Sequence, residues 1–209
     1  MDELVLWGRL NSINVQKVLW TLEELAIPFQ RIDAGLHFGV NKSPEYLQKN
    51  PNGLVPMIDD NGFILWESHT IMRYLAKKQT TLGQLYPNDN QIQAKIEQWH
   101  DWYNTVCWPP MRTLFWGYVR TPEAERNAQE LESARQQMIK VLTILEDQLT
   151  KFKFVACDQF TLADIPVALV AYRWFNIPIE RPSFPNVERW YQEVKKRPGF
   201  LKYSSDPLS

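Results

Sequence analysis

The sequence predicts an α/β domain with a mixed four-stranded sheet, followed by an all-helical domain. Two observations lead to this prediction. Up to residue 80, short apolar runs with the length of strands alternate with helical patterns, whereas from residue 91 onward the apolar spacing is helical throughout. This change predicts two domains, at 1–80 and 91–209, joined by a linker at 81–90 whose Gly83, Pro87 and polar residues are typical of loops.

The first domain begins with a strand, a loop and a helix. The apolar run from Leu4 to Trp7 predicts a buried strand, and a polar loop from Gly8 to Asn14 follows it. Phe29 to Ile32 predicts the second strand. The helix between the two strands has one apolar face, formed by Val15, Val18, Leu19, Leu22 and Leu25.

A hairpin is predicted where the turn residues Asp59 to Gly62 separate two apolar runs, Val55 to Ile58 and Phe63 to Trp66. A short capped helix beginning at Ser43-Pro44 precedes it, and another helix follows Ser68. The order is therefore strand–helix–strand–helix–strand–strand–helix. Because the hairpin adds antiparallel strands, the sheet should be mixed in strand direction.

The second domain reads as a bundle of helices. Its first long helix begins near Ile92 and is interrupted at Pro109-Pro110. Thr121-Pro122-Glu123 has the cap, proline and acid of a helix start, and an apolar stripe runs from Leu131 to Leu149. Thr161 and Asp164 form a variant capping box that predicts another helix.

Composition excludes several classes of function. The net charge of −1 gives no electrostatic reason to expect nucleic acid or an anionic membrane as a partner. No long apolar span and no secretory signal are present, which predicts a soluble cytoplasmic protein. Cys107 and Cys157 are too far apart for a dithiol motif, and the histidines are not grouped as metal ligands (His37, His69, His100), so we expect neither a disulfide nor a metal site.

Two short segments predict a site for a thiol peptide. Pro56 lies between a loop and an apolar strand, where a cis bond would turn the N–H and C=O of Val55 away from the sheet toward a ligand. Glu67 and Ser68 stand where a helix begins. Backbone N–H groups there can receive an anion, and the Glu67 carboxylate can receive an ammonium.

These segments resemble the glutathione-binding half of the cytosolic glutathione transferases, in bacterial theta-like, delta-like or nu-like form. The resemblance covers most of the sequence and includes Phe160 to Ile165, which is similar to the family's capping motif, and the stretch from Pro185 to Pro198. It implies a thioredoxin-like first domain, glutathione as co-substrate without a metal, and a homodimer. By this resemblance Val55-Pro56 contacts the cysteinyl unit, Glu67 the γ-glutamyl ammonium and Ser68 its carboxylate.

Ser12 and Asn14 are the candidate catalytic residues. From the residues alone, either one could simply cap the helix that follows. The resemblance places Ser12 at the catalytic hydroxyl of theta-like and delta-like members, and Asn14 at the asparagine of nu-like members. Both would stabilise the thiolate of glutathione.

The remaining ligands are less well defined. For the glycine carboxylate of glutathione the preceding loop offers His37, Lys42 and Asn52, while Gly53 stands where delta-like relatives carry histidine. His69 is expected to be an ordinary helix-surface residue without a catalytic role. Trp99 is expected in the core, and a pocket for the acceptor is predicted from the neighbouring aromatics and one arginine: Trp102, Tyr103, Trp108, Arg112, Phe115 and Trp116.

The function predicted first is transfer of glutathione to an apolar electrophile. A glutathione-dependent disulfide reductase is the close alternative, which Asn14 leaves open. A non-catalytic interaction or ligand-binding protein of the same fold is the alternative from another class. The sequence does not identify the acceptor.

Overall fold

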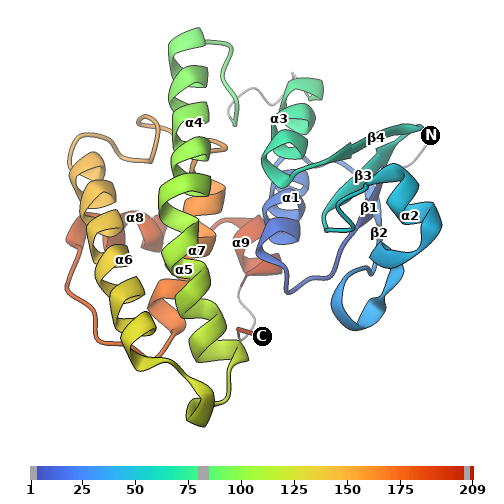
Figure 1. Cartoon of the computed structure of the whole chain (residues 1–209). Coiled ribbons are helices and arrows are strands. Elements are labelled where there is room, and N and C mark those ends of the chain that lie inside the picture. Colours follow the sequence, from blue (N-terminus) through green and yellow to red (C-terminus); the bar gives the residue numbers. More distant parts are fainter. Residues whose placement is uncertain (1–3, 80–84, 205–207) are drawn as a thin grey trace.

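The computed structural model describes residues 4–79, 85–204 and 208–209. It consists of a small sheet flanked by helices and of a larger group of helices beside it (Figure 1). The predicted linker at 81–90 lies partly outside the described residues. None of the described helices combines the length and the apolar character that a membrane span requires.

The sheet has four strands in the order β2-β1-β3-β4, and its mixed direction confirms the prediction. β1 (Leu4–Trp7) pairs parallel with β2 (Phe29–Ile32) and antiparallel with β3 (Met57–Asp60). β3 pairs antiparallel with β4 (Phe63–Trp66). Asn61 and Gly62 have φ of 56° and 88°, as both central residues of a tight two-residue hairpin turn require, so Asp59 and Asp60 belong to the strand rather than to the turn.

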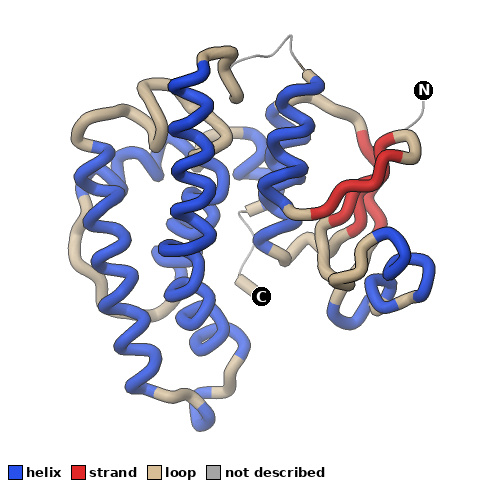
Figure 2. Tube along the Cα trace, turned by 45° about the horizontal axis from the view of Figure 1, so that its top comes forward, coloured by secondary structure: helices blue, strands red, loops and turns tan. Residues whose placement is uncertain are grey.

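Helices cover the sheet on both faces. α1 (Ile13–Glu24) and α3 (Ser68–Lys78) pack together on the side that faces the helical domain, and α2 (Pro44–Lys49) lies on the opposite side (Figures 1 and 2). Two short 3-10 turns, Leu36–Phe38 and Val40–Lys42, connect β2 to α2. The thioredoxin-like order of elements is therefore confirmed.

The helical domain begins with α4 (Asn90–Trp102), which is capped by the carboxylate of Asp89. Contrary to prediction, Pro109 and Pro110 do not interrupt the helix. A π-helical turn at Tyr103–Cys107 leads directly into α5 (Trp108–Phe115), and the prolines stand in the first turn of α5, where a missing N–H costs little. A second π-helical turn, Trp116–Arg120, ends this long rod.

The next helix starts later than the predicted Thr121. Glu123–Glu125 form a single 3-10 turn, and α6 (Ala128–Leu149) begins after Asn127, whose side chain accepts a hydrogen bond from the N–H of Glu130. After it come α7 (Asp164–Asn176), α8 (Pro185–Val194) and α9 (Pro198–Tyr203). Asp164 accepts from the N–H and hydroxyl of Thr161 at 2.8 and 3.3 Å, which is the carboxylate half of the predicted capping box, whereas the Thr161 hydroxyl accepts from the N–H of Ala163 rather than that of Asp164.

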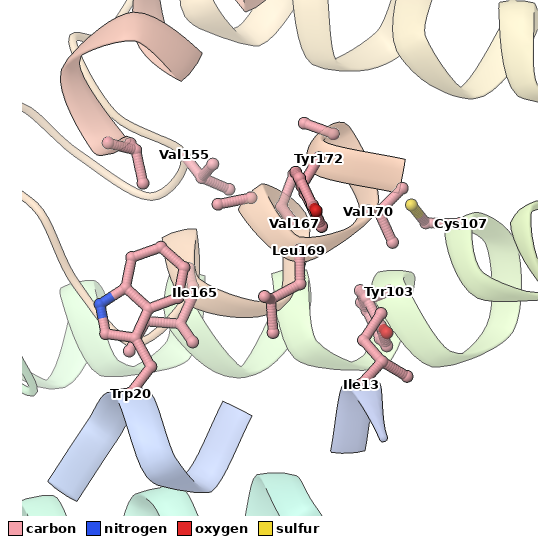
Figure 3. Close-up of a cluster of buried hydrophobic side chains, with 14 of the residues drawn as sticks. Ile13, Trp20, Tyr103, Cys107, Val155, Ile165, Val167, Leu169, Val170 and Tyr172 are labelled. Atoms are coloured by element: carbon pink, nitrogen blue, oxygen red, sulfur yellow. The ribbon is translucent and has the colours of Figure 1, made fainter. Parts of the chain in front are cut away.

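The core runs across the boundary between the two parts. α1 contacts α7 and α9 as well as α3. Figure 3 shows Ile13 of α1 pointing toward Tyr103. In the same view Trp20 of α1 points toward Ile165 and Leu169 of α7. Trp20 is fully buried, and its ring lies 5.5 Å from that of Phe200.

Candidate functional site

The strand register brings three loop segments to one edge of the sheet. Met57 pairs with Trp7 on one side and with Trp66 on the other. The end of β1, the start of β3 and the end of β4 therefore lie side by side. The loop that leads to Ser12 follows the end of β1 directly. The Val55-Pro56 pair directly precedes β3, and the Glu67-Ser68 pair directly follows β4.

The Val55–Pro56 peptide bond is cis, as the sequence predicts. Val55 precedes β3 and lies outside the ladder that β3 forms with its neighbours. An extended peptide laid along this edge would therefore meet the backbone of Val55 next to the start of β3.

Glu67 has a backbone conformation that is rare for a residue with a side chain, with φ of 75° and ψ of 111°. Such a conformation costs free energy and is found preferentially at functional sites. The Glu67 side chain is exposed and makes no capping hydrogen bond, while Ser68, which opens α3, is buried. No acidic side chain occupies the first turn of α3, so its N–H groups can bind a carboxylate.

Ser12 is the residue immediately before α1, but its hydroxyl makes no capping hydrogen bond. Only its backbone carbonyl takes part in the helix, accepting from the N–H of Gln16 at 2.8 Å. Asn14 lies in the first turn of α1, half buried, and no acid there offsets the positive end of the helix dipole. The hydroxyl of Ser12 thus lies at a positive helix end, and capping does not use it.

The three candidates for the glycine carboxylate differ in their surroundings, and Lys42 lies beside Gly53. Gly53 has φ of +58°, and a Cβ built on it would lie 3.1 Å from the Nζ of Lys42. The lysine ammonium therefore fills the space beside Gly53, where a larger side chain would collide. Asn52 instead donates its N–H and its amide to Asn50 Oδ1, and His37 is exposed with its ring 4.0 Å from that of Phe38.

The six residues predicted for the acceptor pocket do not share one of the described cavities. Trp102 lines a cavity between α4 and α6, while Arg112 and Trp116 line another between α5 and α6. Tyr103 is buried at the boundary between the domains with the ring of Trp108 stacked at 6.2 Å. Among the six, Phe115 alone lines the cavity next to the loop that carries Ser12. The two π-helical turns explain the difference, because each changes which residues share a face.

Comparison with known protein families matches both parts of the sequence. Residues 2–77 match the glutathione S-transferase N-terminal domain, and residues 94–198 match the C-terminal domain. The chain belongs to the glutathione S-transferase family. Ser12, Val55-Pro56 and Glu67-Ser68 all fall within the first match.

Individual members of the family are similar along its whole length. Glutathione S-transferase GstB of Escherichia coli is 39% identical over 208 residues, which cover 99% of this chain and 100% of that protein. The theta-class glutathione S-transferase of Xanthomonas axonopodis pv. citri, solved with glutathione bound, superposes with a TM-score of 0.94 at 37% identity and covers 100% of both chains. Elongation factor 1-gamma of Rattus norvegicus is 31% identical over 78% of this chain, but only 37% of that protein is covered.

His69 is not the surface residue that the sequence predicts for this member of the family. It is buried against α4, where its ring stacks on that of His100 at 4.4 Å and its Nδ1 lies 3.2 Å from the amide nitrogen of Asn104. Burial, together with the charges of Lys17 and other cations, holds the pKa of His69 well below its usual range. A neutral imidazole therefore packs directly behind Ser68.

Sequence analysis did not identify two buried cations at the domain boundary. Lys17 of α1 is 1% exposed, with its Nζ 4.0 Å from the centre of the Tyr103 ring, and burial holds its pKa well below its usual range. Arg173 of α7 is 2% exposed and donates to Leu169 O and Gln16 Oε1, each at 3.0 Å. Both interrupt apolar runs in the sequence, and such charged residues are rarely buried without a ligand or a partner.

The described cysteines form no disulfide. Cys107 and Cys157 are both unpaired thiols, and burial raises the pKa of Cys107 to about 12. Such a thiol is unreactive at neutral pH. In the described part of the protein no three metal-binding side chains gather into a possible site.

Proposed function

We propose that this protein is a glutathione transferase in which Ser12, assisted by Asn14, stabilises the thiolate of glutathione for attack on an electrophile with an apolar body. The observation that carries the proposal is the Ser12 hydroxyl, which caps nothing and lies at the positive end of α1. It stands at the same sheet edge as Val55, where the cysteinyl unit would bind.

The rest of glutathione extends from that point in both directions. Val55 pairs with the cysteinyl backbone next to Pro56. The Glu67 carboxylate takes the γ-glutamyl ammonium, and the Ser68 hydroxyl and N–H take its carboxylate, aided by the dipole of α3. The Lys42 ammonium takes the glycine carboxylate. His37 and Asn52, which the sequence also suggested, have a smaller part, because the Asn52 amide is occupied by Asn50.

The thiolate requires a modest stabilisation. A free thiol has a pKa of about 8.5 and is only a few per cent ionised at neutral pH. Lowering this pKa by about 2 units takes roughly 3 kcal/mol of preferential thiolate stabilisation. A hydrogen bond to a charged group contributes about 1.5–3 kcal/mol, so the Ser12 hydroxyl with the Asn14 amide and the helix dipole is sufficient. In the reaction the sulfur forms a bond to the electrophilic carbon while the leaving group departs with its electron pair.

An ultraviolet difference titration of the thiolate tests the proposal. Purified protein at saturating glutathione is titrated from pH 5 to pH 9, and thiolate absorbance should appear about 2 units below the solution pKa. Thiolate absorbance that appears only at the solution pKa would contradict activation by Ser12. It would favour the non-catalytic role that the same fold supports in other proteins.

Disulfide reduction is the second candidate, because Asn14 lies in the first turn of α1 beside Ser12. In that reaction two glutathione molecules would reduce a disulfide and leave as oxidised glutathione. Rates with a chloronitroarene and with hydroxyethyl disulfide, measured on the same preparation, separate the two activities.

We also propose a homodimeric cytoplasmic enzyme whose physiological role is detoxification of electrophiles. These points rest on the family. Sedimentation equilibrium should give twice the polypeptide mass of 24.7 kDa, and a monomer across the micromolar range would exclude the dimer.

A further inference from the structure

A small cavity lies beside the loop that carries Ser12. It has a volume of about 90 Å³ and is formed where α1, α5, α7 and α9 meet. Asn11, the residue before Ser12, is part of its wall. The other lining residues include Gln16, Phe115, Arg173, Lys202 and Ser209.

The cavity wall is cationic. Its described lining residues include Arg173 and Lys202 but no Asp or Glu. Lys202 is paired with Glu23 at 2.7 Å, outside the lining. Arg173 contacts only uncharged acceptors, and its Nε is buried without a hydrogen-bond partner among the described residues. Burial lowers the pKa of Arg173 to about 10, so the guanidinium is still charged at pH 7.

A second guanidinium approaches from the end of the long helical rod. Arg120 lies 5.5 Å from the centre of the Phe115 ring, and Arg173 lies 5.3 Å from the same ring. Arg120 donates to the backbone oxygen of Ser209 at 2.5 Å, and Asn11 donates to the hydroxyl of Ser209 at 3.1 Å. Oxygen atoms of Ser209 therefore already bind Arg120 on one side and Asn11, in the loop after β1, on the other.

A third arginine makes the region more positive. Arg9 belongs to the loop after β1, and its Nε is also buried without a partner among the described residues. Burial and the nearby charge of Arg120 lower its pKa. Cations placed this close repel one another, and they persist in a folded protein mainly where an anion binds between them.

Building on the function proposed above, we propose that the acceptor substrate is an aromatic acid whose carboxylate binds at this cavity, to Arg173 in its wall and to Arg120, which lies beside it on Ser209 and Phe115. The cavity has room for a carboxylate group but not for a complete aromatic acceptor. The ring must therefore extend out of the cavity, past Asn11 and toward Ser12. The carboxylate displaces the oxygen of Ser209 from Arg120.

The reaction leaves the carboxylate unchanged. In 4-chloro-3-nitrobenzoate the thiolate sulfur attacks the ring carbon that bears chlorine, a C–S bond forms, the C–Cl bond breaks, and chloride leaves with the electron pair. Binding of the carboxylate by the two arginines fixes the position of that carbon relative to the sulfur.

The test compares 4-chloro-3-nitrobenzoate with 4-chloro-3-nitrobenzamide, which has nearly the same shape but no charge. kcat/KM for each is divided by its uncatalysed rate constant with glutathione. The wild-type protein should prefer the benzoate. Arg120→Gln and Arg173→Met should each lower the value for the benzoate by about 10- to 100-fold, the loss expected for one charge-assisted hydrogen bond, and leave the benzamide nearly unchanged.

Arg181→Gln is the matched control. The Nε of Arg181 is likewise buried without a partner among the described residues, but this arginine lines a different groove, beside α8. It should leave the preference intact. If Arg173→Met does not fold, Arg120→Gln alone decides, because Arg120 is only half buried.

Three results would overturn the inference. The first is that the wild type gives equal normalised kcat/KM values for the two acceptors. The second is that the arginine variants lower kcat/KM equally for both acceptors. The third is that a rise in KM for glutathione accounts for the lower kcat/KM values. The last result would assign the arginines to glutathione itself. If the wild type reacts with neither acceptor, the proposed transferase activity is at fault. Calorimetric binding of unreactive 3-nitrobenzoate and 3-nitrobenzamide then decides the inference separately, and equal affinities would refute it.

Discussion

His69 of α3 and His100 of α4 stack across the boundary between the two domains, with ring centroids 4.4 Å apart and ring planes 21° apart. Both rings are buried, and His100 Nε2 lies 3.0 Å from the backbone oxygen of Leu162, to which it must donate. Burial lowers the pKa of His100 to about 4 and that of His69 further. Both imidazoles are therefore neutral at pH 7, and the nearby charge of Lys17 also favours the neutral form.

This pair predicts a loss of stability in mild acid. Below about pH 6.5 the unfolded protein takes up protons on these histidines, whereas the folded protein does not, so the free energy of unfolding falls as the pH falls. For His100 the loss extends down to about pH 4, at up to about 1.4 kcal/mol per pH unit. His100→Gln keeps a donor for Leu162 and removes one titrating group. Urea unfolding at pH 7, 6 and 5 should show a shallower decline for the variant; an identical decline would contradict the assignment.

Ser12→Ala is expected to raise the pKa of bound glutathione thiol by about 1–2 units, since one charge-assisted hydrogen bond is lost. Glutathione affinity should change little, because the peptide contacts remain. Ser12→Thr, which keeps a hydroxyl, serves as the control and should retain most of the shift. The measurement is the same thiolate titration. An unchanged titration in Ser12→Ala would remove Ser12 from the catalytic role.

Glu67→Gln should weaken glutathione binding by about 10- to 100-fold, because the γ-glutamyl ammonium loses its charged partner. The dipeptide cysteinylglycine lacks the γ-glutamyl unit and should bind the variant and the wild type equally. Calorimetry with both peptides checks the assignment. Equal weakening of both peptides would show that Glu67 only maintains the local backbone.

Lys42→Met should weaken glutathione binding by about twofold to fivefold, since the glycine carboxylate loses an exposed cation. The glycyl monoethyl ester of glutathione carries no charge at that end, so the variant should bind it as well as the wild type does. His37→Ala is the comparison for the neighbouring loop residue. A larger effect in His37→Ala than in Lys42→Met would transfer the role to His37.

Gly199→Ala is expected to destabilise the fold by at least about 1–3 kcal/mol, the usual cost of overpacking. A Cβ at this position would lie 2.1 Å from the Trp20 ring, which is fully buried and has no room to move. Chemical denaturation gives the change in the free energy of unfolding. Gly39→Ala is a control without such a neighbour, because nothing lies within 4 Å of its added Cβ; its φ of +65° is the remaining source of strain. A Gly199→Ala variant as stable as the wild type would show that α1 and α9 can move apart at the contact between Trp20 and residue 199.

Local sequence signals predicted the sheet and the cis bond at its edge well, because the features that form them are close in sequence. Asn61-Gly62 makes a tight turn wherever it joins two apolar runs, and the cis bond before Pro56 needs only a proline in the right place. Assigning roles to Ser12 and Glu67 still required resemblance to a family, since capping residues look the same in sequence.

The predictions that failed depended on packing between distant segments. Thr121 has cap chemistry as good as that of Asn127. However, Gly117 packs so closely on Leu131 that a Cβ built on Gly117 would lie 2.3 Å from the Leu131 side chain. We infer that this close contact determines where α6 can begin. His69 looked like a surface residue because its cover comes from α4.

The packing of α1 between α3 on one side and α7 and α9 on the other limits how such a protein can be recombined. A fragment that ends near residue 80 would expose Trp20 and the ammonium-bearing face of α1 to water, although it contains every proposed glutathione ligand. Exchanging the helical domain for that of a relative would remove Tyr103, whose ring contacts the buried ammonium of Lys17 in α1. If the proposed roles of α1 and of the helical domain hold, new acceptor specificity is more accessible by point substitution than by exchange of domains, because the two parts share one core.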